Sequence, residues 1–185
     1  SVGVVRATAL AVVGAAIDFA LRFDEAVLIE RGVSGRELEC AVLGYLGLGA
    51  IEASCVGEIV PGNEFYDYAD KYLEDNAQLI APADLPPAIT DRLRDLAVRA
   101  FTALGGAGLA RVDFFLEGDQ LYVNELNTLP GFTSISMYPR LWALSGVPLA
   151  ELVGRLVEIA FARHRDQHRL DLGIKEFLAS LAVKA

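Results

Sequence analysis

Two strand-like segments near the middle of the chain constrain its fold more than any other feature. Residues 109–116 and 120–126 each alternate apolar with polar side chains, and Glu117-Gly118-Asp119 between them favours a tight turn. Alternation with a period of two is typical of strands that bury one face and leave the other for polar contacts. The two segments therefore predict an antiparallel hairpin that packs one apolar face on a core.

The polar face of this hairpin gathers four side chains that can bind ions or charged ligands. Arg111 and Asp113 lie two residues apart on the first strand, so they face the same side. Glu125 and Asn127 do the same on the second strand, and their oxygens suit Mg²⁺ together with phosphate oxygens and water. A solvated ion pair on an exposed hairpin is the simpler interpretation, but the strongly apolar neighbours and the unusual loop that follows favour a functional site.

The loop that follows, residues 127–137, combines a glycine with several hydroxyl side chains. Gly131 allows a ligand to approach the backbone closely. The N–H and O–H groups of such a loop can donate hydrogen bonds to a carboxylate or to a developing oxyanion. The hairpin and its loop together predict a site for an anionic reaction centre.

The rest of the chain predicts further strands and helices around this hairpin. Strands are expected at residues 26–29, 36–46 and 50–60, the last two as a hairpin. Helices are expected at residues 8–23, 86–104, 139–144, 148–163 and 174–183. The clearest is 86–104, where apolar residues recur every three or four positions. Strands followed by helices, with an antiparallel hairpin at the centre, predict an α+β fold.

Composition excludes several classes of partner. The formal net charge of -9 gives no general attraction to nucleic acid or to an anionic membrane surface, so neither partner is expected. No apolar run reaches the roughly 18 residues that a membrane span needs, since Asp18 ends the longest one early. Cys40 and Cys55 form no zinc or disulfide motif, and we interpret them as buried thiols of a cytoplasmic protein.

Three motifs are similar to those of the D-alanine-D-alanine ligase family of the ATP-grasp superfamily. They are Arg-Val-Asp-Phe-Phe at 111–115, Asn-Glu-Leu-Asn-Thr-Leu-Pro-Gly-Phe-Thr at 124–133, and Glu-Phe-Tyr-Asp-Tyr-Ala-Asp-Lys-Tyr at 64–72. The resemblance covers residues 1–161 and leaves 174–185 outside. It implies the end of the central ATP-grasp subdomain in residues 1–34. Residues 35–185 are then the C-terminal subdomain, an antiparallel sheet flanked by helices, and the N-terminal substrate domain is absent from this chain.

The resemblance also implies which residues bind ATP and its metal ions. Two Mg²⁺ or Mn²⁺ ions would be held on the ATP phosphates by Asp113, Glu125 and Asn127, with Glu125 bridging the ions. The nucleotide would be contacted by Glu30, Arg31, Val33, Glu37 and Lys71. Among these, Glu30 and the backbone near Arg31 and Val33 would meet the adenine, Glu37 the ribose and Lys71 the phosphates.

A second group of residues is implied at the reacting amino acids. Arg111 and the N–H of Gly131 would stabilise the tetrahedral oxyanion, and Tyr72 would close over the substrate. Ser136 and Met137 would fix the carboxylate of the second D-alanine.

The activity implied is ATP-dependent ligation of two D-alanine molecules through an acyl phosphate, for peptidoglycan precursor synthesis by a homodimeric full-length enzyme. Two alternatives stay open. The first is a D-alanine-D-lactate ligase, although the loop at residues 65–72 looks like the dipeptide-forming type. The second is a catalytically incomplete ATP-binding fragment, because family members carry a substrate domain and two phosphate-binding lysines upstream of the residues that match Ser1 to Gly3.

Overall fold

The computed structural model describes residues 2–60, 78–133 and 135–182. The chain divides into two compact units. One consists of Ser1–Ser34 and Val60–Gln78, and the other of Gly35–Ile59 and Leu79–Ala185. The second, which we call the sheet unit, carries almost all of the sheet and the helices that pack on it.

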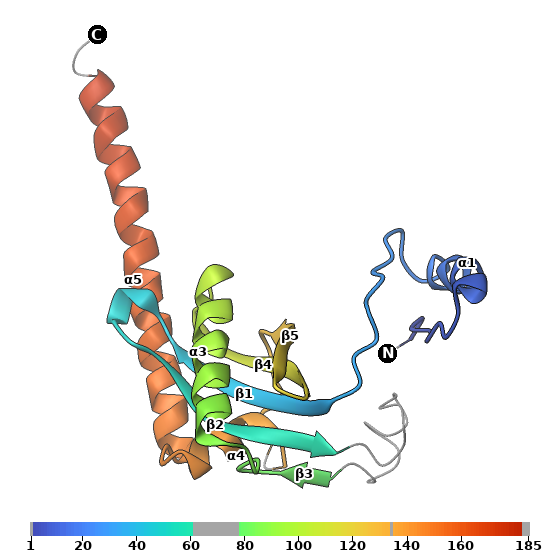
Figure 1. Cartoon of the computed structure of the whole chain (residues 1–185). Helices are drawn as coiled ribbons and strands as arrows, with labels where there is room; N and C mark the ends of the chain where they lie inside the picture. Colours follow the sequence, from blue (N-terminus) through green and yellow to red (C-terminus); the bar gives the residue numbers. More distant parts are fainter. Residues whose placement is uncertain (1, 61–77, 134, 183–185) are drawn as a thin grey trace. The chain divides into compact units, whose positions relative to one another are not determined.

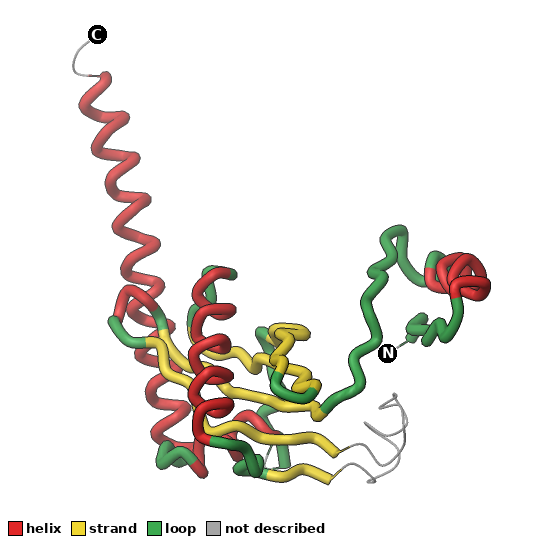
Figure 2. Tube along the Cα trace, viewed as in Figure 1, coloured by secondary structure: helices red, strands yellow, loops and turns green. Residues whose placement is uncertain are grey.

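A five-stranded sheet in the order β3-β2-β1-β4-β5 forms the centre of the sheet unit (Figures 1 and 2). Its strands are β1 (Arg36–Gly44), β2 (Ile51–Val60), β3 (Gln78–Ile80), β4 (Gly108–Glu117) and β5 (Gln120–Asn127). The β1–β2, β1–β4 and β4–β5 pairs are antiparallel, and the 3-10 helix η1 (Leu46–Leu48) joins β1 to β2. Both predicted hairpins and the α+β class are confirmed, whereas the short strand β3 was not predicted.

One face of the sheet packs against helix α3 (Pro87–Ala103) and forms the main apolar core (Figure 1). Alternate residues of β1 and β4 point to this face, among them Leu38, Cys40, Val42, Val112 and Phe114. The helix contributes Leu93, Ala97 and Phe101, which recur every four residues and so share one side of it. This pattern is the one that predicted the helix.

The opposite face is covered at one end by helices α4 (Met137–Leu144) and α5 (Leu149–Ala182). Ala41 and Leu43 of β1 pack there with Tyr138 and Trp142. The buried Tyr138 hydroxyl donates a hydrogen bond of 2.9 Å to the carbonyl of Val42, which ties α4 to the strand. This apolar cover ends where the polar side chains of the same face begin.

For the smaller unit one prediction is wrong, and another is confirmed with shorter bounds. Residues 26–29 form no strand, and Leu28 and Ile29 are 81% and 68% exposed. A strand needs backbone partners, and the five strands of the described sheet include none from this run. The helix expected at 8–23 is the shorter α1 (Leu10–Ala20), which begins after Ala9 without a side-chain cap from Thr8 and has no buried residue.

The two C-terminal helices predicted at 148–163 and 174–183 are one continuous helix, α5. Most residues between them are polar, and polarity alone does not end a helix. Gly173 costs a helix about 1 kcal/mol relative to alanine, which one residue in a long helix tolerates. Despite the length of α5, no helix within the described ranges is apolar enough over a sufficient span to cross a membrane.

Candidate functional site

A row of three carboxylates crosses the polar face of the sheet, and we call it the carboxylate row. Glu39 of β1 lies opposite Asp113 of β4, and Asp113 lies opposite Glu125 of β5. Directly opposite residues of antiparallel strands share a face, so the three side chains project on the same side. In the next position Arg111 lies opposite Asn127. The register thus brings together the four hairpin residues singled out from the sequence.

Arg111 is held by two members of this row. Its Nε donates to Oδ1 of Asp113 and its Nη2 to Oδ2, both at 2.7 Å. Nε also lies 3.1 Å from Oε1 of Glu39. The side chains of Arg111 and Asp113 are 15% and 16% exposed, and that of Glu39 only 4%. The result is a largely buried guanidinium between two carboxylates.

Glu39 was not predicted as a site residue. The available signal was its spacing of two from Glu37 in an otherwise apolar strand, which places both carboxylates on the polar face. That signal does not reveal the partner, because Arg111 lies far along the chain and meets Glu39 only through the β1–β4 pairing.

The pKa of Arg111 reflects these surroundings. Burial by itself lowers the pKa of a guanidinium, because it disfavours the charged form. The hydrogen bonds to Asp113 and the negative charges of Glu39, Asp113 and Glu125 oppose this effect, and together they raise the pKa of Arg111 above its ordinary value. The site therefore maintains a fixed positive charge on Arg111.

The outer part of the carboxylate row suits a hard divalent cation. Glu125 is exposed, and each Asp113 oxygen keeps lone-pair capacity beyond its bond to Arg111. Asn127 accepts a hydrogen bond of 3.1 Å from the N–H of Leu129 through Oδ1. No cluster of three or more His, Cys, Asp or Glu side chains poised for a metal occurs in the described part of the chain. Two carboxylates and an amide instead fit Mg²⁺, which completes its shell with water and phosphate oxygens.

The glycine loop is braced around Ser136. The Ser136 Oγ accepts a hydrogen bond of 3.0 Å from the N–H of Thr133 and lies 2.8 Å from its hydroxyl oxygen. A Cβ added at Gly131 would lie 2.8 Å from the same Oγ, so a side chain at that position would displace the Ser136 hydroxyl. Gly131 therefore lets the backbone approach Ser136 and leaves its own surface open to a ligand.

Helix α4 begins beside this loop. Its N-cap is Ser136, whose side chain makes no capping hydrogen bond. The first N–H groups of a helix have no partner within it and attract anions. Met137 is buried, and a Cβ added at Gly57 would lie 2.4 Å from its Cε, so the Met137 side chain lies against β2. Gly57 is itself opposite Glu39, so the start of α4 adjoins the carboxylate row.

Six further predicted residues take no part in the contacts described above. Glu37 is half-buried on β1 and shares the face of Glu39. Glu30, Arg31 and Val33 belong to the smaller unit, in a segment without regular secondary structure. Lys71 and Tyr72 lie outside the described residues. The roles expected for these six residues stay predictions, as do the roles expected for the residues of the hairpin and the glycine loop.

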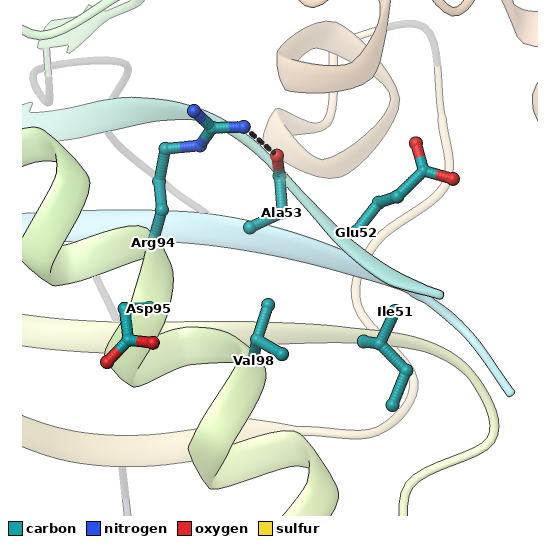
Figure 3. A pocket seen from close by; sticks show the side chains of 6 residues that line it. All are labelled: Ile51, Glu52, Ala53, Arg94, Asp95 and Val98. Carbon is teal, nitrogen blue, oxygen red and sulfur yellow. Dashed lines mark hydrogen bonds between the residues drawn. The ribbon is translucent and has the colours of Figure 1, made fainter. Parts of the chain in front are cut away.

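A separate open hollow lies on the face of the sheet that packs against α3 (Figure 3). It is lined by Ile51, Glu52, Ala53, Arg94, Asp95 and Val98. Its arginine, Arg94, donates a hydrogen bond of 2.9 Å to the carbonyl of Ala53. None of the predicted site residues lines it, so we do not place the reaction centre there.

Comparisons with known proteins show which family this chain resembles. The model of a family described as D-ala D-ala ligase C-terminus matches residues 1–158. A D-alanine--D-alanine ligase of Acetivibrio thermocellus is 51% identical over 168 residues, which are 90% of this chain and 44% of that protein. This chain spans about half the length of the curated relatives it matches.

Solved structures of D-alanine-D-alanine ligases also resemble this chain. A D-alanine-D-alanine ligase from Coxiella burnetii superposes with a TM-score of 0.80 at 36% identity, over 95% of this chain and 45% of that one. A D-alanine--D-alanine ligase from Bacillus anthracis, solved with ATP, matches with a TM-score of 0.68 at 25% identity, over 83% and 48% of the two chains. The ATP-grasp fold predicted from the sequence is confirmed by these matches.

Proposed function

Because this chain belongs to the D-ala D-ala ligase C-terminus family, we propose that it supplies the ATP, metal and acceptor sites of an enzyme that joins two D-alanine molecules. The observation that carries the proposal is the carboxylate row with Arg111 fixed inside it, next to the glycine loop and the start of α4. Residues 1–34 would complete the central subdomain, and residues 35–185 would form the C-terminal subdomain.

In this proposal three side chains hold the metal ions and five residues hold the nucleotide. Asp113, Glu125 and Asn127 would bind two Mg²⁺ or Mn²⁺ ions on the ATP phosphates. When bound, the ions supply charge neutralisation for phosphoryl transfer. The ATP itself would be contacted by Glu30, Arg31, Val33, Glu37 and Lys71.

The reaction would proceed in two steps without a protein nucleophile. A carboxylate oxygen of the first D-alanine takes the γ-phosphoryl group of ATP, which gives an acyl phosphate and ADP. The amine of the second D-alanine then attacks the acyl carbon, loses a proton, and expels phosphate. Arg111 and the N–H of Gly131 would stabilise the negative oxygen of the tetrahedral intermediate, since donors aimed at developing charge lower the barrier most.

The second D-alanine would be fixed by its carboxylate. The start of α4 offers N–H donors at Met137 and the hydroxyl of Ser136, which the loop holds in place. Tyr72 would close over this end of the site.

At the cellular level we propose a cytoplasmic, homodimeric enzyme that provides the dipeptide for peptidoglycan precursors and thereby serves cell-wall synthesis and cell shape. Its substrates are small molecules, ATP and D-alanine. The net charge of -9 supports this assignment, since it opposes binding to nucleic acid or to anionic membranes.

Product analysis with the full-length protein tests the proposal. Incubation with ATP, Mg²⁺ and D-alanine is expected to release ADP and D-alanyl-D-alanine, detected by mass spectrometry. Parallel reactions with D-lactate or D-serine as a second acceptor measure competing products near neutral pH. Depsipeptide as the dominant product would overturn the dipeptide assignment in favour of a D-alanine-D-lactate ligase.

The length of the chain supports a second proposal about the 185 residues taken alone. Because they span about half of the relatives they match, we expect ATP binding without turnover from this piece. ADP release that depends on D-alanine, from residues 1–185 alone, would contradict this expectation.

A further inference from the structure

Burial changes steeply along the carboxylate row. The Glu39 side chain is 4% exposed, that of Asp113 is 16% exposed, and Glu125 is exposed. A cation with its water and phosphate ligands needs open space, which the Glu125 end provides. Glu39 lies at the closed end, behind the guanidinium of Arg111. The third carboxylate is therefore placed to act on Arg111 and not on a ligand.

The charge of Glu39 exceeds what a structural ion pair needs. Asp113 alone already gives Arg111 two hydrogen bonds of 2.7 Å. On the other face of the sheet, Arg36 makes the same pair of 2.7 Å bonds with one carboxylate, that of Glu58. Burying a second carboxylate beside Arg111, directly opposite Asp113, adds a desolvation cost and a like-charge repulsion. A purely structural ion pair avoids both.

We propose that Glu39 is a positioning residue that keeps Arg111 aimed at the reacting acyl group while Asp113 serves a metal ion. The inference rests on the proposed function, in which Asp113 has two duties. If its oxygens bound a cation, its hold on Arg111 would weaken, whereas Glu39 would keep its contact with Nε, which is 3.1 Å long. These contacts with Glu39 and Asp113 occupy Nε–H and one Nη2–H, and in the proposal other N–H groups of the guanidinium face the oxyanion.

Steady-state kinetics of the full-length enzyme separate positioning from stability. We expect Glu39→Gln to lower kcat by about 10- to 100-fold, because a loosely held donor loses much of its effect on the transition state. The KM for ATP should change by less than about twofold, because Glu39 is not among the residues proposed to contact the nucleotide. An unchanged kcat in a folded Glu39→Gln protein would overturn the proposal.

Glu58→Gln is the matched control. Glu58 is also a buried glutamate on the same sheet with two bonds to an arginine, but on the face away from the site. This substitution should lower thermal stability at least as much as Glu39→Gln and leave kcat within about twofold of the native value. Equal losses of kcat in the two variants would show that Glu39 acts only through stability.

A double-mutant cycle with Arg111→Lys separates the proposed role of Arg111 from the proposed positioning role of Glu39. If Glu39 acts through Arg111, the double variant loses no more kcat than Arg111→Lys alone. A normal kcat in Arg111→Lys would refute the proposed role of Arg111. If Arg111→Lys strongly lowers kcat, and Glu39→Gln lowers it by the same factor in the presence and absence of Arg111→Lys, only the positioning role is refuted.

The side-chain Nε–H of Arg111 gives a readout that does not depend on turnover. In nitrogen-15 NMR of the native protein, this proton should remain protected from solvent exchange before and after addition of Mg²⁺ with a non-hydrolysable ATP analogue. In Glu39→Gln the protection should fall at least about tenfold after the addition. Equal protection in both proteins would contradict the proposal.

Discussion

On the face of the sheet under α3, Cys40 is fully buried and its thiol is kept neutral, whereas on the opposite face Arg111 is mostly buried and stays charged. Burial raises the pKa of Cys40 to about 12, because the apolar core disfavours the thiolate. The same effect acts against the charge of Arg111, but Asp113 and Glu39 outweigh it. Burial thus favours the neutral form of an ionisable group. A buried group stays charged only where hydrogen bonds and opposite charges stabilise the charged form.

The two arginine pairs of the sheet sharpen this contrast. Arg36 binds Glu58 and also donates to the carbonyl of Asp84 at 2.9 Å, so it joins β1, β2 and the segment after β3. These contacts involve only one carboxylate and connect secondary-structure elements. Arg111 instead lies between two carboxylates, those of Glu39 and Asp113. The same bidentate geometry therefore joins secondary-structure elements on one face and, in the proposed function, holds a reaction-centre arginine on the other.

The largest expected effect concerns the thiol of the apolar face. A shift of the pKa from 9.0 to about 12 leaves roughly 1000-fold less thiolate at pH 8. Alkylation of Cys40 with iodoacetamide should therefore be slower by about that factor or more in the native protein than in urea, as measured by peptide mass spectrometry. Cys55 is only partly buried and should react faster than Cys40 in the native protein. Equal native and unfolded rates for Cys40 would remove the contrast between the faces.

The next effect concerns packing under α3. Phe101 is 1% exposed, and its replacement by alanine should lower the free energy of unfolding by about 3–5 kcal/mol, because it leaves a cavity in the core. Urea unfolding measures this loss. Leu104 ends the same helix but is exposed, so Leu104→Ala should cost less than about 0.5 kcal/mol. In the protein that remains folded, Phe101→Ala should leave kcat within about twofold, and a large loss of kcat would mean that the two faces are coupled.

The smallest of these effects concerns the metal requirement of the polar face. Asp113→Asn should raise the Mg²⁺ concentration for half-maximal activity by about 10- to 100-fold, because a charged ligand is replaced by a neutral one. Chelation by EDTA should abolish activity, and added Mg²⁺ should restore it. Asp119→Asn, in the exposed turn of the same hairpin, should leave the Mg²⁺ requirement unchanged. Identical shifts in both variants would argue for a general charge effect and against a metal site at Asp113.

Several elements could be predicted because their signals are local. The alternation in residues 109–116 and 120–126 led to the β4–β5 hairpin, and the spacing of apolar residues in 86–104 led to α3. The same period placed Arg111 and Asp113 on one face. The prediction failed for residues 26–29, where an apolar run alone does not establish that a neighbouring strand exists.

What the sequence by itself determined is the hairpin with its polar face, the glycine loop and the family of the chain, since each rests on the identity and spacing of neighbouring residues. Only the tertiary structure decided that Glu39 meets Arg111 and that Gly57 makes room for Met137. These contacts depend on the register of β1 with β4 and β2 and on the packing of α4. Register between distant segments is fixed by burial of the whole apolar face, which no local pattern contains.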